Sequence, residues 1–191
     1  MSLPSFAVVD LETSGLSTRR HRVLQLGVVT VESDGTVLDT WSSLVKLRWP
    51  LQRVGPTEIH GITRRTLRGA PALDDALDQL GARLDGSIFT AHNAAFDAAC
   101  IARARRHRPP DDPLRRGIEP LLCTLQMSRR LDPLRERSHR LADVCDRYGV
   151  VLERPHDALG DALATAAVLP HLLDAHGITT VEQLQPVYVR L

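Results

Sequence analysis

Hydrophobic and polar positions divide the chain into a strand-rich first part and a helix-rich second part. A run of four apolar residues starts at Phe6 and leads directly into Asp10 and Glu12. Asp34 and Gly35 form a strong hairpin signal between two later runs, so we expect the second and third strands to be antiparallel neighbours. The apolar runs predict strands that begin at Phe6 and cover residues 23–31, 36–47, 87–91 and 118–124.

Apolar residues at helical spacing predict helices over most of the second part of the chain. The predicted helices cover residues 73–84, 94–106, 125–131, 141–148 and 158–173. Pro170 falls inside the last of them, where we expect it to kink or divide the helix. Residues 107–117 contain three prolines and two aspartates, and they are predicted to form a surface loop.

The order of these elements predicts one α/β domain over residues 1–191, with the motifs described below inside its core, about residues 5–175. Hairpin-connected strands come first and then strands alternate with helices, which is typical of a mixed sheet. No apolar run approaches the length of a membrane span. The N-terminus also lacks a basic region followed by an apolar one, so we expect a cytoplasmic protein without membrane contact.

Composition limits the function classes only weakly. Basic and acidic side chains are nearly balanced, 24 against 23, so any affinity for nucleic acid must come from local patches. The three cysteines, Cys100, Cys123 and Cys145, are far apart in the sequence. They predict neither a disulfide framework nor a zinc site, and they suit a reducing compartment.

The first strand places two carboxylates on one face, because alternate residues of a strand point to opposite sides. Phe6, Val8, Asp10 and Glu12 share that face. Two neighbouring carboxylates at the end of a buried strand repel each other and lose hydration unless a cation or a proton lies between them. A divalent metal bound by oxygen ligands would offset this cost. The alternative is a strand end where both side chains reach water.

Two further aspartates occur one turn into predicted helices, and each follows a loop that contains a histidine. Asp97 lies in the helix that follows the fourth predicted strand, and Asp161 lies in the last long helix. An inward-facing aspartate on an alanine-rich helix needs a partner, which favours metal ligation for both. The alternative is a favourable interaction with the helix dipole, and this is the role we expect for Asp157 as an N-cap.

Three motifs, in this order, resemble those of the DEDDh branch of the DnaQ-like 3′–5′ exonucleases. They are Asp10-x-Glu12-Thr-Ser-Gly-Leu16, His92-Asn-x-x-Phe-Asp97 and His156-x-x-x-x-Asp161. The resemblance extends over about residues 6–173. Within the family, the chain is similar to the nuclease domain of the DNA polymerase III epsilon subunit. It implies a ribonuclease H-like α/β fold, with a mixed sheet whose antiparallel hairpin strands precede parallel ones. Many members have a glutamate where this chain has Gln25.

The resemblance implies hydrolysis of phosphodiesters from a free 3′ end, with release of nucleoside 5′-monophosphates. Asp10, Glu12, Asp97 and Asp161 would hold two Mg²⁺ or Mn²⁺ ions, a pair that can clamp the attacking and leaving oxygens of an in-line displacement. His156 would be the general base for the attacking water, because the reference pKa of histidine, about 6.5, lies close to neutral pH.

The resemblance also implies residues that contact the 3′ nucleotide. Thr13 would contact the terminal sugar, Leu16 and Ile59 would wedge against bases, and Asn93 and Phe96 would help to place the scissile phosphate. For Leu16, Ile59 and Phe96 the alternative is ordinary core packing. Three other residues near the motifs are expected to pack or form hydrogen bonds: His60, His92 and Cys123.

Arginines concentrate in two segments, which would either track phosphates or form an ordinary solvated surface. They are Arg103, Arg105, Arg106, Arg108, Arg115 and Arg116, followed by Arg129, Arg130, Arg135, Arg137 and Arg140. If the segments track phosphates, replacement of Arg105 and Arg106 should weaken binding and flatten its salt dependence.

The leading hypothesis is therefore a 3′–5′ exonuclease that acts on single-stranded DNA, in proofreading or repair. An RNase T-like or oligoribonuclease-like exoribonuclease is the first alternative, although an aromatic content of only 4% favours DNA over RNA. A catalytically idle accessory module of a polymerase is the second, and the complete set of motif residues argues against it. The chain ends soon after its last predicted long helix, so we expect a stand-alone nuclease or a different docking surface if it associates with a polymerase.

Overall fold

The structure is a computed structural model that describes residues 3–49, 51–109, 111–112, 114 and 118–189. Its described residues form one mixed sheet of six strands in the order β3-β2-β1-β4-β5-β6. The strands are β1 (Phe6–Thr13), β2 (Val23–Val31), β3 (Val37–Leu44), β4 (Ile88–Ala91), β5 (Leu121–Cys123) and β6 (Tyr188–Val189). Strands β1, β2 and β3 pair antiparallel, β1, β4 and β5 pair parallel, and β6 is antiparallel to β5. The predicted α/β class and mixed sheet are confirmed.

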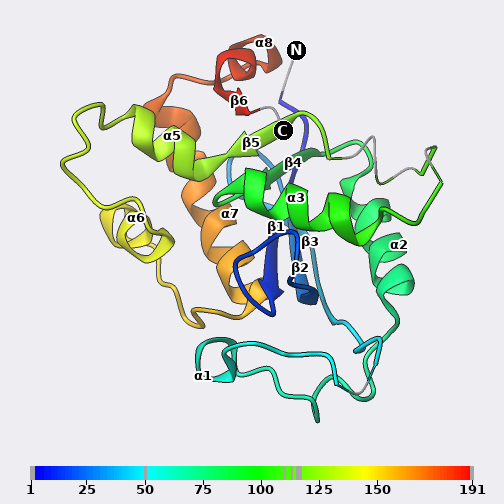
Figure 1. The fold of residues 1–191 in the computed structure, drawn as a ribbon. Coiled ribbons are helices and arrows are strands. Elements are labelled where there is room, and N and C mark those ends of the chain that lie inside the picture. Colours follow the sequence, from blue (N-terminus) through cyan, green and yellow to red (C-terminus); the bar gives the residue numbers. More distant parts are fainter. Residues whose placement is uncertain (1–2, 50, 110, 113, 115–117, 190–191) are drawn as a thin grey trace.

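Helices cover both faces of the sheet (Figure 1). They are α1 (Thr57–His60), α2 (Leu73–Leu84), α3 (Ala94–Ala104), α5 (Thr124–Arg130), α6 (Leu141–Tyr148), α7 (Ala158–Ala175), α8 (Val181–Leu184) and the 3₁₀ helix η1 (Gln185–Val187). Helices α2 and α3 contribute to one hydrophobic cluster, and α6 and α7 contribute to another on the opposite face. The alternation along β1 sorts its side chains between the two, with Val9 in the first cluster and Val8 in the second.

Three predicted boundaries were wrong, two of them for a local reason. The fifth strand starts only at Leu121, because Pro120 has no N–H to donate to the ladder. The third strand ends at Leu44, after which the Lys46 amide donates to the carbonyl of Pro71 instead of β2. Helix α3 ends at Ala104, two residues before the end of the helix predicted for residues 94–106.

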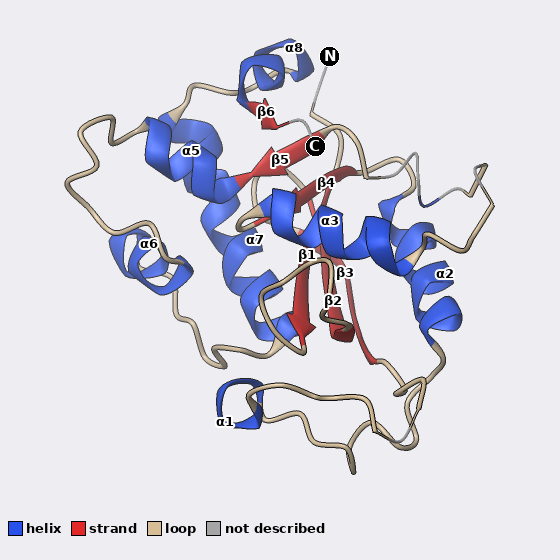
Figure 2. Ribbon diagram, viewed as in Figure 1, coloured by secondary structure: helices blue, strands red, loops and turns tan. Residues whose placement is uncertain are grey.

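Pro170 does not divide the last long helix, which runs without a break from Ala158 to Ala175 (Figure 2). Burial of Leu169, Leu172 and Leu173 against the sheet offsets the hydrogen bond that proline removes. In the predicted surface loop at 107–117, residues 110, 113 and 115–117 lie outside the described residues, and the described part contains two buried residues, Asp112 and Leu114. Asp112 is 5% exposed and forms an ion pair with Arg108.

The close contact between β2 and α7 depends on Gly27. A Cβ atom at this position would lie 2.3 Å from the carbonyl oxygen of Ala158, the first residue of α7. Since Gly27 pairs with Asp10, the start of α7 is held directly beside the carboxylates of β1.

The start of β1 and the short strand β6 lie at the same end of the sheet, away from α1 (Figure 1). Leu3 and Tyr188 pack against the same hydrophobic cluster. Among the described residues, the helices are too short or too polar to cross a bilayer.

Candidate active site

The four predicted metal ligands come together at the end of β1. Asp10 and Glu12 lie on the face of β1 that is covered by α7, and Asp161 lies in the first turn of that helix. Asp97 joins them from α3, which begins directly after β4, the parallel neighbour of β1. Asp97 is 3% exposed. The carboxylates therefore come from two strand and two helix positions that are far apart in the sequence.

Burial and mutual repulsion raise the pKa of each of these four carboxyl groups. The pKa of Asp10 lies well above its usual value because of burial and of the charges on Asp97, Asp161 and Glu12. Burial, with the charges of Asp161 and Asp157, raises the pKa of Glu12 to about 7. Burial also raises the pKa of Asp97 and Asp161. Acidic groups crowded in this way are favoured in the ionised form only when a cation joins them.

A divalent cation fits this arrangement. One ligand atom from each of Glu12, His156 and Asp161 lies within 4.8 Å of the others. The Oδ1 atom of Asp161 is buried without a hydrogen-bond partner among the described residues, whereas its Oδ2 accepts a hydrogen bond of 3.2 Å from the His156 amide. An orphaned carboxylate oxygen that faces other acidic groups is a suitable cation ligand.

His156 is exposed and close to the carboxylates rather than set apart from them. Its backbone has a φ of 63°, a left-handed conformation that is uncommon for a residue other than glycine. This turn directs the His156 amide toward Asp161. A nitrogen of the imidazole lies within 4.8 Å of a carboxylate oxygen of both Glu12 and Asp161.

Asp157 is the N-cap of α7, as predicted, and it contributes more to the site than the sequence indicated. Its Oδ2 accepts from the Gly160 amide at 3.0 Å, and its Oδ1 accepts from the Gln25 side chain at 2.9 Å. Gln25 pairs with Glu12 across the strands, so it links the central sheet to the start of α7. No local pattern around Gln25 predicted this link, and only its position opposite Glu12 could have pointed to it.

The residues predicted to contact the 3′ nucleotide differ in burial and in their contacts. Leu16 is 89% exposed and Ile59 is 52% exposed, so core packing is wrong for both. Phe96 is half-buried and packs against the core, which fits the packing alternative. The Thr13 hydroxyl donates to the Gly15 carbonyl at 2.8 Å, and Asn93 is exposed at the N-cap of α3.

The packing and hydrogen-bonding roles expected for three residues are confirmed. His60 Nδ1 accepts from the Ile62 amide at 3.0 Å, and its Nε2 lies 3.1 Å from the Val54 carbonyl oxygen. His92 lies between the Thr124 hydroxyl and the His139 carbonyl, both at 3.0 Å, and burial lowers its pKa to about 4. Cys123 is 2% exposed.

The arginine-rich segments do not form one continuous free surface. Arg108 is bound to the carboxylates of Asp78 and Asp112, so it is not available to phosphates. Arg115 and Arg116 lie outside the described residues. Arg135 and Arg140, by contrast, line a pocket of about 390 Å³ beside Asn93.

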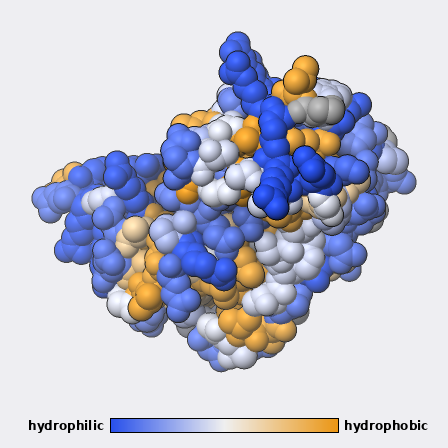
Figure 3. All heavy atoms as spheres, turned by 90° about the horizontal axis from the view of Figure 1, so that it is seen from below, coloured by the Kyte–Doolittle hydropathy of each residue, from blue (hydrophilic) through white to orange (hydrophobic). Residues whose placement is uncertain are grey.

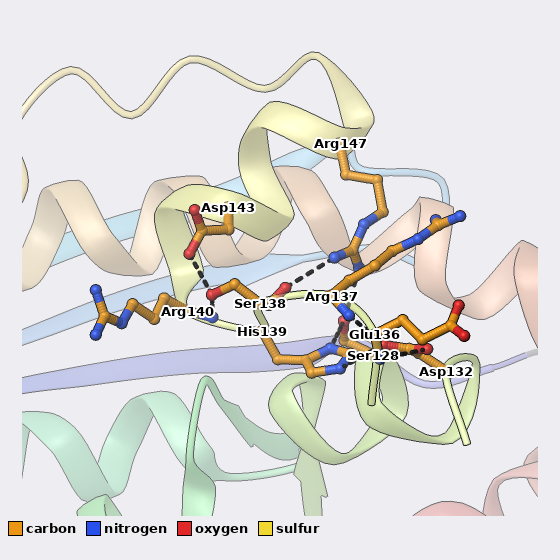
Figure 4. A network of polar contacts seen from close by, with 9 residues as sticks. All are labelled: Ser128, Asp132, Glu136, Arg137, Ser138, His139, Arg140, Asp143 and Arg147. Carbon is orange, nitrogen blue, oxygen red and sulfur yellow. Dashed lines mark hydrogen bonds and ion pairs between the residues drawn. The ribbon is translucent and has the colours of Figure 1, made fainter. Parts of the chain in front are cut away.

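A polar network holds the loop between α5 and α6 that carries these arginines (Figure 4). The Arg137 amide donates to Asp132 at 2.9 Å. His139 connects Ser128 and Asp132, at 2.9 and 3.2 Å. The side chains of Arg137 and Arg140 extend away from the network (Figure 4).

The surface at the α1 end of the molecule is mainly hydrophilic, with apolar patches between the polar ones (Figure 3).

The chain matches a known protein family. The model of the RNase T exonuclease family matches residues 7–169. The chain belongs to this DnaQ-like exonuclease family. The match includes all of the acidic residues described above and His156.

The exonuclease chain is also similar to segments of large bacterial polymerases. It is 31% identical over 185 residues to a PolC-type DNA polymerase III of Streptococcus thermophilus, a match that covers 94% of this chain and 12% of that protein. The corresponding protein of Thermotoga petrophila is 30% identical over 184 residues, with 95% and 13% covered. The chain spans about 12% of the length of the first of these relatives.

Solved structures of exonucleases share the fold. Exonuclease X, in complex with a 5′-overhanging duplex DNA, is 26% identical with a TM-score of 0.70, and the match covers 95% of this chain and 98% of that chain. Escherichia coli exonuclease I, in complex with a dT13 oligonucleotide, has a TM-score of 0.73 at 17% identity, with 91% and 42% covered. The ribonuclease H-like architecture expected from the motifs is confirmed.

Proposed function

We propose that the chain is a metal-dependent 3′–5′ exonuclease that removes nucleoside 5′-monophosphates from single-stranded DNA. The observation that carries this proposal is the group of four carboxyl groups with raised pKa values at the end of β1. Such a group is expensive to ionise without cations. Its position in a chain of the exonuclease family supports phosphodiester hydrolysis as its use.

Asp10, Glu12, Asp97 and Asp161 would hold two Mg²⁺ or Mn²⁺ ions, with His156 close enough to join one of them. Bound metal ions would stabilise the charge that develops on the phosphoryl oxygens and on the leaving group. The carboxylates fix the position of that charge stabilisation, because Asp97 and Asp10 are buried or partly buried on rigid elements.

His156 would act as the general base. It would take a proton from the water that attacks phosphorus, while the bond from phosphorus to the 3′ oxygen of the preceding nucleotide breaks. That 3′ oxygen then gains a proton, and the released product carries the phosphate on its 5′ position. A positioned general base of this kind contributes about 10²–10⁴-fold to the rate.

The preference for DNA is supported by the relatives. Exonuclease X binds DNA in the structure cited above, at 26% identity, and the PolC-type relatives are DNA polymerases. The same relatives support an association with a polymerase as part of the proposal. Exposed Leu16 and Ile59 would wedge against bases, Thr13 would contact the terminal sugar, and Asn93 would help to place the phosphate.

The test is degradation of 5′-labelled DNA and RNA single strands of the same sequence, with Mg²⁺ or Mn²⁺ and with EDTA. The variants are Asp10→Asn, His156→Gln and, as a control, Glu153→Gln, which alters an exposed acid in the same loop as His156. We expect stepwise shortening of DNA from the 3′ end, lost in EDTA and in Asp10→Asn and unaffected in Glu153→Gln.

Mn²⁺ binding measured in parallel separates the two roles open to His156. A general base predicts that His156→Gln keeps its Mn²⁺ affinity and loses about 10²–10⁴-fold in kcat. Loss of Mn²⁺ affinity would instead make His156 a ligand. Faster degradation of RNA than of DNA, or no activity in a folded, metal-bound protein, would overturn the proposal.

A further inference from the structure

A second pocket lies on the opposite face of the sheet from α7. It has a volume of about 530 Å³ and is enclosed by the start of β2, the segment that follows β3, the start of α2 and the second half of α3. Figure 1 shows α2 and α3 side by side on this face. We call it the basic pocket, after the five cationic side chains that line it: Arg22, Lys46, Arg48, Arg103 and Arg106.

These cations have no carboxylate partner among the described residues. One acidic residue, Asp74, is among the described residues that line the pocket. Its Oδ1 already lies 2.9 Å from Nε2 of His107. The Nε atom of Arg103 is buried without a hydrogen-bond partner in the described part of the chain. Burial and the neighbouring charges of Arg103, Arg106 and Arg48 lower the pKa of Arg22. The positive charges are therefore close enough to repel one another.

Packing of the fold does not require these five cationic side chains to lie together. Like charges gathered around a concave surface destabilise the protein slightly and attract anions. Guanidinium groups are suited to bidentate contacts with phosphate oxygens. The buried part of the lining is apolar, with Val23 and Val45 7% and 4% exposed beside the partly buried Leu73 and Ala104, whereas most of the cationic side chains are exposed. A cationic rim above an apolar wall matches a ligand with a phosphate end and a flat, weakly polar end.

The volume points to one nucleotide unit, because pockets for small organic ligands typically enclose about 300–1,000 Å³. His21 and His107 also line the pocket, and both histidine and arginine side chains can stack on bases. Cys100 and Arg103 follow Asp97 by about one and two turns of α3. The basic pocket thus begins close to the carboxylate site but faces away from α7.

We propose that the basic pocket is a second binding site, separate from the carboxylates, for a nucleoside phosphate. The ligand is either a free nucleotide or a nucleotide within a strand that also reaches the carboxylates. The proposal rests on the pocket alone and does not depend on the nuclease function proposed above.

The test uses calorimetry with the full chain in EDTA, where no metal ion can attach a phosphate to the carboxylates. The probes are dATP and a ten-nucleotide oligothymidine. The pocket variant is Arg48→Gln/Arg106→Gln, and the control is Arg65→Gln/Arg68→Gln, which removes the same charge from an exposed turn. All four arginine positions are exposed, so the variants should fold, and circular dichroism would verify this.

We expect the pocket variant to bind dATP at least about tenfold more weakly than the control, because it loses two charge-assisted contacts with the phosphates. If the pocket variant binds oligothymidine more weakly but binds dATP as well as the control does, the ligand is a nucleotide within a strand. Equal affinities in the two variants for both probes, or no binding of either probe to the unaltered chain, would overturn the proposal.

Discussion

The side-chain amide of Gln25 donates a hydrogen bond of 2.9 Å to Asp157, 132 residues later in the chain. The bond joins the second strand to the N-cap of α7, and the side-chain oxygen Oε1 of Gln25 accepts from the Ala158 amide at 3.5 Å. The first turn of α7 carries Asp161, so this contact positions a proposed metal ligand without touching the metal site itself.

Replacement of Gln25 by alanine should reduce exonuclease activity more than stability. A hydrogen bond contributes about 1 kcal/mol to stability, whereas a small displacement of Asp161 would cost a larger factor in kcat. Ser42→Ala is the matched control, because it removes the exposed hydrogen bond that Gln25 makes at 3.2 Å. Denaturant unfolding and kcat should both stay near wild-type values in Ser42→Ala. Equal activity in the two variants would show that Gln25 has no positioning role.

Gly27→Ala should displace α7 from the sheet. The new methyl group would lie 2.3 Å from the Ala158 carbonyl oxygen, and overpacking of this kind costs about 1–3 kcal/mol. Gly81→Ala in α2 is the control, since its nearest neighbour would be 3.7 Å away and alanine favours a helix by about 1 kcal/mol over glycine. Urea unfolding should show Gly27→Ala destabilised and Gly81→Ala unchanged or stabilised.

Stability without metal should fall as pH rises. Asp10, Glu12, Asp97 and Asp161 have raised pKa values in the folded state, so the folded chain holds protons that the unfolded chain has already released. Stability is then highest below the usual carboxyl pKa and declines through about pH 7, the pKa of Glu12. Thermal unfolding in EDTA between pH 4 and pH 8 would measure the decline.

Metal should restore stability at the upper end of this range. Mn²⁺ at one hundred times its dissociation constant would add about 2.7 kcal/mol, or roughly 5–10 °C for a chain of this size. Asp10→Asn should be more stable than wild type at pH 8 in EDTA and should gain little from Mn²⁺. A stability that rises with pH in EDTA would contradict the carboxylate cluster.

Leu16→Ala and Ile59→Ala should raise KM for single-stranded DNA with little effect on folding. Both side chains are exposed, and surface substitutions usually change stability by less than about 0.5 kcal/mol. Loss of an apolar contact with a base should raise KM by about tenfold, since burial of a leucine is worth about 1.5–3 kcal/mol. Leu51→Ala, another leucine that is 89% exposed, should leave KM unchanged.

Arg135→Gln/Arg140→Gln should flatten the salt dependence of strand binding. Both arginines line the pocket beside Asn93, and each phosphate contact on a single strand contributes about 0.7 to the slope of log K against log salt. Loss of both contacts should reduce the slope by about 1.4. Fluorescence anisotropy between low and moderate salt would measure it, with Arg65→Gln/Arg68→Gln as the charge-matched control. An unchanged slope would exclude phosphate contacts by these two arginines.

The sequence was sufficient for the elements that local patterns determine. The alternation from Phe6 to Glu12 gave the correct faces of β1, and Asp157 could be identified as an N-cap from its place before an alanine-rich helix. The hairpin at Asp34 gave the correct pairing of β2 with β3. Each of these features depends on neighbours within a few residues.

Features that depend on distant partners could not be predicted in this way. Gln25 meets Asp157 only after the sheet and α7 have packed together, and Gly27 is needed only because that packing is so close. The short strand β6 shows no apolar run of its own, since its place at the edge comes from pairing with β5. Pro170 remained inside a helix because tertiary burial outweighed its local preference.

The shared position of the two chain ends has a consequence for how this domain can be built into larger proteins. Leu3 and Tyr188 pack on the same cluster, and the start of β1 and strand β6 lie at the end of the sheet away from α1 (Figure 1). A partner protein could therefore be attached at either end, or the whole domain inserted into a surface loop of another enzyme, without covering the end of β1 that carries the carboxylates. The carboxylates lie at the end of β1, opposite the end of the sheet that holds β6 and the start of β1.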